Sequence, residues 1–135
     1  MGLAAAIDFL ADDLHEHGVG HVAITVDRDE LAKLPKRYEL PIFRVIQELF
    51  SNVRQHAKAA NVTLTVVYHK DESPMLRIYV RDDGVGFDPK NPPRKGLGLT
   101  GIQERIHQLD GRITIESSAG HGSQIQILIP VDTRG

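Results

Sequence analysis

Three glycines in the stretch KGLGLTGIQERI have the spacing of a phosphate-binding loop. Gly96, Gly98 and Gly101 form the pattern G-x-G-x-x-G, and a helical pattern follows them. Glycine lets the backbone approach phosphates closely at the start of a helix, where unpaired N–H groups and the helix dipole attract anions. A dinucleotide site also needs a strand leading into the glycines, but the preceding DPKNPPRK has adjacent prolines typical of an irregular loop. The pattern therefore favours a nucleotide phosphate site of another kind.

A carboxylate, an amide and an imidazole follow one another at helical spacing. Glu48, Asn52 and His56 stand at i, i+4 and i+8, so an α-helix would align them in one stripe. Mg2+ prefers oxygen ligands and keeps several waters, so one amide oxygen together with nucleotide phosphates is an ordinary arrangement for it. A solvated helix face has the same pattern, because polar residues usually stand opposite apolar ones on a surface helix. The spacing alone leaves both interpretations open.

A third cluster, RDDGVGFD, follows an alternating apolar run. Asp82 ends that run, and Gly84 and Gly86 give the backbone freedom to fold tightly around a flat ligand. A carboxylate here would accept hydrogen bonds from an adenine amino group, and a buried contact of this kind contributes about 1.5–3 kcal/mol. D-D-G-V-G is also a good turn sequence, so this cluster alone does not decide between a site and a turn.

The composition limits the possible partners. A chain of 135 residues, 41% hydrophobic and 25% charged, predicts one globular domain over residues 1–135. The net charge of -2 gives no general attraction to nucleic acid or anionic lipid, so we expect neither a nucleic-acid nor a membrane contact. The absence of cysteine suits a cytoplasmic domain, and no apolar run is long enough to span a membrane. A membrane anchor elsewhere in a parent protein stays open.

The apolar periodicity predicts an α+β domain. Helical spacing recurs over residues 3–14, from Pro41 to residue 57, and over residues 102–109 up to Gly111. Strict alternation predicts strands at 22–26, 62–66, 76–80, 113–115 and 125–129, with 62–66 and 76–80 as a hairpin or adjacent strands. This order predicts a two-layer sandwich in which the helices cover one face of a mixed sheet.

The order of the three clusters along the chain is more specific than any one of them. ELFSNVRQHA, DDGVG and GLGLTG resemble the N, G1 and G2 boxes of the GHKL, or Bergerat-fold, ATPase superfamily. IFRVIQELFSNVRQHAKA, DDGVGFD, GLGLTGIQERI and GHGSQIQILIP are similar to the catalytic ATP-binding domain of two-component sensor histidine kinases. The subgroup with the most similar motifs works with NarL-type response regulators. The resemblance extends from Gly2 to Pro130 and implies a mainly antiparallel sheet.

The resemblance implies roles for the helical stripe. Asn52 matches the N-box asparagine that ligates Mg2+, and Glu48 matches an acidic residue that acts as a base or supports the metal site. His56 matches the histidine that lies near the phosphates. Many relatives carry a lysine where this chain has Gln55, so an ionic phosphate contact from that turn is in doubt.

The resemblance also implies a set of nucleotide-binding residues. Asp82 would bind the adenine amino group, with Gly84 and Gly86 shaping the pocket and the Ser123 hydroxyl close to the base. Residues 88–95 would form a short ATP lid, in which Arg94 and Lys95 are possible phosphate contacts. After Lys95, the residues expected to bind the nucleotide are Gly96, Leu97, Gly98, Leu99 and Gly101.

The implied function is phosphoryl transfer. The domain would bind Mg-ATP and, in the full-length protein, transfer the γ-phosphate to a histidine on a separate dimeric helical domain. Catalysis would consist of positioning and charge neutralisation, since phosphoryl transfer needs little covalent chemistry from protein groups. An anti-sigma-factor serine kinase, which shares the fold and the Glu-x-x-x-Asn helix, and a nucleotide-binding regulatory module without transferase activity are the alternatives.

Some residues outside the three boxes also allow two interpretations. His15, His17 and His21 could form a metal cluster, but they fall across a helix end and a glycine turn, which favours solvated histidines. Phe87 is expected to pack at the lid hinge. Arg105 either reaches a phosphate or pairs with Glu104 on the helix surface.

Overall fold

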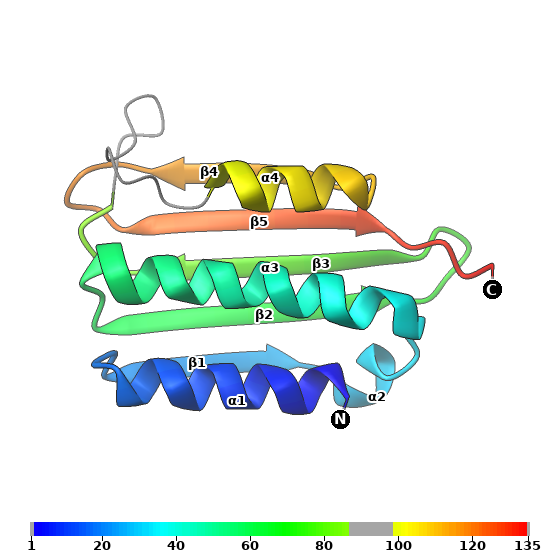
Figure 1. Cartoon of the computed structure of the whole chain (residues 1–135), viewed down its shortest axis with the longest axis horizontal. Coiled ribbons are helices and arrows are strands. Elements are labelled where there is room, and N and C mark those ends of the chain that lie inside the picture. Colours follow the sequence, from blue (N-terminus) through cyan, green and yellow to red (C-terminus); the bar gives the residue numbers. More distant parts are fainter. Residues whose placement is uncertain (1, 87–98, 135) are drawn as a thin grey trace.

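The fold is seen in a computed structural model that describes residues 2–86 and 99–134, without the side chains of His56 and Ala57. In this part of the chain five strands form one sheet in the order β1-β2-β3-β5-β4 (Figure 1). The strands are β1 (His21–Val26), β2 (Asn61–His69), β3 (Met75–Asp82), β4 (Arg112–Ser117) and β5 (Ser123–Pro130). Only β1 and β2 are parallel neighbours, and the other pairs are antiparallel. The predicted mixed, mainly antiparallel sheet is confirmed.

The longer helices cover one face of this sheet. α1 (Leu3–Glu16), α3 (Glu39–Asn52) and α4 (Leu99–Gln108) lie side by side over it (Figure 1). The short helices α2 (Arg28–Leu31) and η1 (Lys36–Tyr38) lie in the connection between β1 and α3. The two-layer α+β sandwich is therefore confirmed.

The core lies between the helices and one side of the strands. Alternate residues of β2 and β3, such as Leu64 and Ile78, are fully buried against the helix layer. From α3, Ile42 and Ile46 are also fully buried, and each such side chain contributes about 1.5–3 kcal/mol. The intervening strand residues, such as Arg77, face the other side of the sheet, which no helix covers in Figure 1. This alternation fixes which strand residues can point into the helix layer.

α3 differs from the prediction at both ends. It begins at Glu39, so Pro41 lies within the first turn, where a missing N–H breaks no intrahelical bond. After Asn52 the α-helix gives way to a π-helical turn, η2 (Val53–Ala57), which Lys58 ends in the left-handed region with φ 51°. The prediction of a regular α-helix to residue 57 is therefore wrong after Asn52.

At the end of α4, two adjacent residues provide the left-handed backbone conformation and the close packing. Asp110, with φ 60°, takes the left-handed position, and the Gly111 N–H donates to the Ile106 carbonyl at 2.8 Å, as in a Schellman motif. Gly111 is needed for packing, since a Cβ there would lie 2.9 Å from side-chain atoms of both Ile106 and Ile129. Its lack of a side chain thus lets the end of α4 approach β5.

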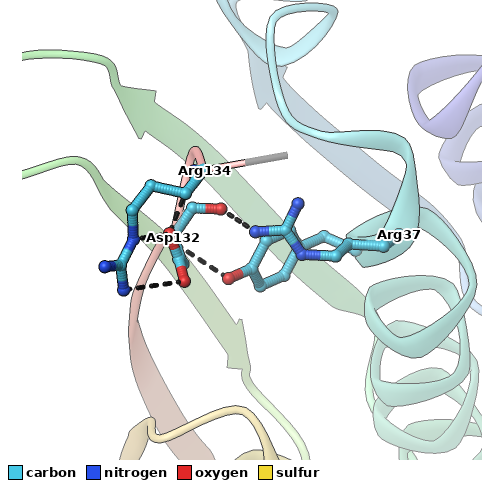
Figure 2. A network of polar contacts seen from close by, with 4 residues as sticks. Arg37, Asp132 and Arg134 are labelled. Carbon is cyan, nitrogen blue, oxygen red and sulfur yellow. Dashed lines mark hydrogen bonds and ion pairs between the residues drawn. The ribbon is translucent and has the colours of Figure 1, made fainter.

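The chain after β5 is attached to the segment that leads into α3 (Figure 2). The Asp132 N–H donates to the Tyr38 hydroxyl at 2.9 Å, and the Arg37 guanidinium donates to the Asp132 carbonyl. Arg134 Nε donates to the Asp132 carboxylate at 3.1 Å. These contacts hold the end of the described chain beside the start of α3.

Among the described residues no helix is long and apolar enough to cross a membrane.

Candidate nucleotide site

The described parts of the three sequence clusters meet at one end of the molecule. The C-terminal ends of α3 and β3 lie at the same end, on the left in Figure 1, as the N-terminal ends of α4 and β5. Asn52 is the last residue of α3, Asp82 ends β3 and Ser123 begins β5. Clusters far apart in the sequence therefore border one region of the surface.

Asp82 is the one charged side chain that is buried among the described residues, with 5% exposure. It stands in register with Val62 on one side and Ser123 on the other. The Gly84 N–H donates to its Oδ1 at 2.9 Å, and the Ser123 hydroxyl donates to its Oδ2 through a short hydrogen bond. A buried carboxylate requires such donors, and each oxygen keeps a lone pair that can accept from a ligand.

The glycine loop after Asp82 packs against the turn between β4 and β5. Gly86 has φ 67°, and a Cβ there would overlap the Ser118 carbonyl oxygen. Gly122 has φ 74°, and a Cβ there would overlap the Asp82 carbonyl oxygen. Sequence reasoning gave no role to Gly122, although the G-x-G just before the alternating run of β5 was a possible signal. The loop conformation depends on both glycines.

The neighbouring Asp83 has a different, structural role. Its Oδ1 accepts from the backbone N–H groups of Ala60 and Asn61 at 2.9 and 2.8 Å, and its Oδ2 accepts from Asn61 Nδ2 at 2.7 Å. These hydrogen bonds, the one from the Asn61 side chain above all, hold the pKa of Asp83 below its usual value. Asp83 thus fixes the end of β3 to the start of β2, while Asp82 faces the core.

Glu48 lies at the junction of α3 and α4. Its Oε1 accepts from Arg105 Nε at 3.1 Å, and a Cβ added to Gly101 would lie 3.7 Å from its Oε2. Arg105 therefore pairs with Glu48. The sequence analysis considered a phosphate or Glu104 as its partner. The partners are 57 residues apart in sequence, so local spacing had no signal for this contact.

The expected stripe on α3 is only partly preserved. Asn52 is partly exposed one α-helical turn after Glu48, so these two residues share a helix face. His56 belongs to the π-helical turn, where α-helical i+4 spacing no longer applies, and its side chain lies outside the described structure. Gln55 is exposed and donates to the Ser51 hydroxyl on its own helix at 3.3 Å.

Several predicted residues cannot be placed. The segment 87–98 lies outside the described residues. It contains Phe87, the predicted lid at 88–95 with Arg94 and Lys95, and the phosphate-loop residues Gly96, Leu97 and Gly98. The described end of this loop is the first turn of α4. There Leu99 packs partly buried against the core, and Gly101 faces Glu48.

His15 and His17 make local hydrogen bonds, and His21 is the exposed first residue of β1. His15 Nδ1 lies 3.0 Å from the Val19 carbonyl oxygen, and His17 Nδ1 lies 2.7 Å from that of Asp13. The His17 contact satisfies a carbonyl in the last turn of α1, whereas Val19 lies in the turn after the helix. Within residues 2–86 and 99–134 no group of three or more His, Cys, Asp or Glu side chains is placed to hold a metal ion.

Comparison with known structures finds the same fold in histidine kinases. The blue-light activated histidine kinase of Erythrobacter litoralis EL346 superposes with a TM-score of 0.74 at 22% identity, over 97% of this chain and 42% of that one. Residues 37–133 match the family of histidine kinase-, DNA gyrase B- and HSP90-like ATPases. The chain belongs to this family, and the predicted superfamily is confirmed.

The similar curated proteins are sensor kinases. DegS of Brevibacillus brevis, a signal transduction histidine-protein kinase/phosphatase, is 32% identical over 84% of this chain and 29% of its own length. The sensor histidine kinase ComP of Bacillus subtilis (strain 168) is 34% identical over 96% of this chain and 16% of its own. The chain thus spans less than a third of the length of these relatives. It is an ATP-binding domain of the kind that these kinases contain.

Proposed function

We propose that this domain binds Mg-ATP and, within a larger protein, transfers the γ-phosphate to a histidine on a dimeric helical domain. The observation that carries the proposal is the buried carboxylate of Asp82 at the end of β3. It lies at the same end of the molecule as the polar end of α3 and the start of α4 (Figure 1). ShkA, whose fold is similar with a TM-score of 0.70, was solved in complex with AMPPNP.

Asp82 would select adenine. Its carboxylate is almost fully desolvated and is held in place by Gly84 and Ser123, so it presents a fixed acceptor to the adenine amino group. Guanine has a carbonyl oxygen at the equivalent position, and two acceptors would then face each other. A site built to meet a donor rejects such an analogue by a factor on the order of 100 or more.

Asn52 would provide a metal ligand. Its side chain is partly exposed at the end of α3, and no described residue hydrogen-bonds to it, so an amide oxygen is available for a hard cation. When bound, Mg2+ neutralises charge on the phosphates. Glu48, one turn earlier, lies on the same helix face and adds a carboxylate to this end of the domain.

The transfer step that we propose uses these residues and a histidine of the acceptor domain. A lone pair on the acceptor imidazole attacks the γ-phosphorus, the bond to the bridging oxygen breaks, and ADP leaves with that electron pair. The proton on the other imidazole nitrogen is taken up by the Glu48 carboxylate. Most of the rate enhancement comes from holding the reactants in line.

The wider context is proposed from the same resemblance. The phosphoryl group would pass from the histidine to a NarL-type response regulator, and the domain would work on the cytoplasmic side, where ATP is available. The names of the relatives favour a histidine kinase over the serine-kinase alternative. Phosphorylation of a serine on a partner, with no phosphohistidine formed, would support that alternative.

Titration calorimetry of the 135-residue chain tests the proposal. Mg-ATP should bind weakly, and GTP should compete far less well than ATP, with Asp82→Ala as the matched variant after a check of its fold by circular dichroism. No binding of ATP or ADP at millimolar concentration would refute the nucleotide assignment. Equal competition by GTP would refute the role of Asp82.

Radiolabelled ATP tests the transfer step. The isolated chain should acquire no phosphohistidine, whereas adding the dimeric acceptor domain should give acid-labile label on a histidine outside this sequence. Label on the chain itself that is lost in His56→Ala would contradict this division of labour.

A further inference from the structure

The junction of α3 and α4 contains an ion pair that the proposed mechanism does not yet use. Arg105 Nε donates to Glu48 Oε1 at 3.1 Å. Gly101, one helical turn before Arg105 on the same face of α4, lies beside the second oxygen, Oε2. Among the described residues no donor contacts Oε2. One oxygen of Glu48 is therefore fixed, while the other remains available as an acceptor.

The ion pair is a weak contributor to the stability of the fold. The Glu48 and Arg105 side chains are 33% and 43% exposed, and pairs this exposed contribute little to stability. α4 is already held on the sheet by Ile102 and Ile106, which are fully buried. Loss of the pair should therefore leave the helix packing intact.

The pair has a stronger effect on where the Glu48 carboxylate points. A glutamate side chain has several rotamers, and a partly exposed one stays mobile unless a partner holds it. Glu48 also borders a groove of about 410 Å³ between α1 and α3, where Arg54 offers a second cation. Arg105 draws the carboxylate to the α4 side instead. The ion pair thus holds the Glu48 carboxylate toward α4.

We propose that Arg105 is a positioning residue, which holds the Glu48 carboxylate beside the first turn of α4, where it takes up the proton that the acceptor imidazole releases. This inference rests on the proposed function of the domain. Arg105 acts through Glu48 and does not bind the phosphates. It therefore affects the rate of phosphoryl transfer and leaves the affinity for nucleotide unchanged.

The test uses Arg105→Gln in a reaction where the chain phosphorylates the acceptor domain. We expect kcat to fall about 10- to 100-fold, as for a misplaced catalytic group, with the Kd values for ATP and ADP unchanged. Arg105→Lys keeps a charged donor and should recover part of the rate. The matched control is Arg44→Gln, which removes an equal charge from the same α3–α4 groove and should keep the wild-type rate. Arg44 donates to Gln47 at 3.2 Å, and within residues 2–86 and 99–134 it has no other hydrogen-bond partner.

Two combined variants separate positioning from simple attachment of the helices. In a Glu48→Gln background, Arg105→Gln should have no further effect on kcat, because Arg105 acts through that carboxylate. The exchange Glu48→Arg with Arg105→Glu should keep the wild-type melting temperature but should not recover the rate, because the carboxylate then stands on the wrong helix.

Three results would overturn the inference. A wild-type rate in Arg105→Gln would show that the ion pair has no part in transfer. Weaker binding of ATP but not ADP in that variant would show that Arg105 contacts the γ-phosphate. Recovery of the rate in the exchanged pair would show that the contact only ties the helices together. If the unmodified chain neither binds ATP nor transfers phosphate, the proposed function itself has failed.

Discussion

Ser123 donates a hydrogen bond to the carboxylate of Asp82 across two neighbouring strands, from the register position directly opposite it. The contact fixes one carboxylate oxygen, and the Gly84 N–H fixes the other. Asp82 is therefore already oriented before any base arrives. Because the side chain is already ordered, less conformational entropy is lost when a ligand binds.

Ser123→Ala should weaken ATP binding about tenfold, because Gly84 alone then holds the Asp82 carboxylate, which must be ordered when the base binds, at a cost on the order of 1 kcal/mol. Ser123→Thr keeps the hydroxyl and should bind ATP like the wild type. Titration calorimetry of the three proteins measures the difference. Equal affinity in the alanine variant would mean that Gly84 alone orients the carboxylate.

Asn52→Ala should abolish the increase in ATP affinity that Mg2+ produces, because an alanine side chain offers no oxygen ligand. ATP titrations with Mg2+ and with EDTA give the metal-dependent part of the binding free energy. Ser51→Ala, on the preceding residue, is a suitable control. If Mg2+ strengthened ATP binding equally in Asn52→Ala and the wild type, the ligand would have to be another residue.

Asp83→Asn should make stability less dependent on pH in the acid range. The pKa of Asp83 is lowered in the folded state by Asn61 and Ala60, so its stabilising effect is present above the unfolded pKa of about 4. That effect is lost as the pH falls through the lower folded pKa. Melting curves should show the wild type more stable than the variant at pH 7, with the difference shrinking below about pH 4. A difference that grows on acidification would contradict the assigned direction.

Gly111→Ala should destabilise the domain by about 1–3 kcal/mol, because the added Cβ would be forced against Ile106 and Ile129. Asp110→Gly should be neutral or stabilising, because it places a glycine at φ 60°. Urea unfolding of both variants compares these adjacent positions. If Asp110→Gly were the more damaging change, the two roles at the end of α4 would be reversed.

Sequence patterns predicted the fold well because each strand and helix buries one face. The buried residues alternate in β2, β3 and β5 and recur at helical spacing in α1 and α3, so the positions of apolar residues in the sequence show which face is buried. The π-helical turn after Asn52 was not predictable in this way. Its apolar Val53 fits α-helical spacing, so the residue order there carries no signal for the change to a π-helical turn.

The candidate site was predicted residue by residue, but its supporting contacts were not. Asp82 and Ser123 were expected near the same ligand group, and the structure joins them by a hydrogen bond. The pairing of Glu48 with Arg105 and the close approach of Gly122 to Asp82 arise only when distant segments pack together. Residue spacing within one segment has no information about such contacts.

The uncovered face of the sheet offers a place to attach a spectroscopic reporter. Arg77 is exposed there on β3, between Val67 and Leu128 of the adjacent strands. The chain contains no cysteine, so Arg77→Cys would introduce a single thiol for dye labelling. A dye at this position lies across the sheet from the helix layer and touches none of the residues assigned to the nucleotide. A change in its fluorescence on adding ATP would therefore report a rearrangement transmitted through the sheet.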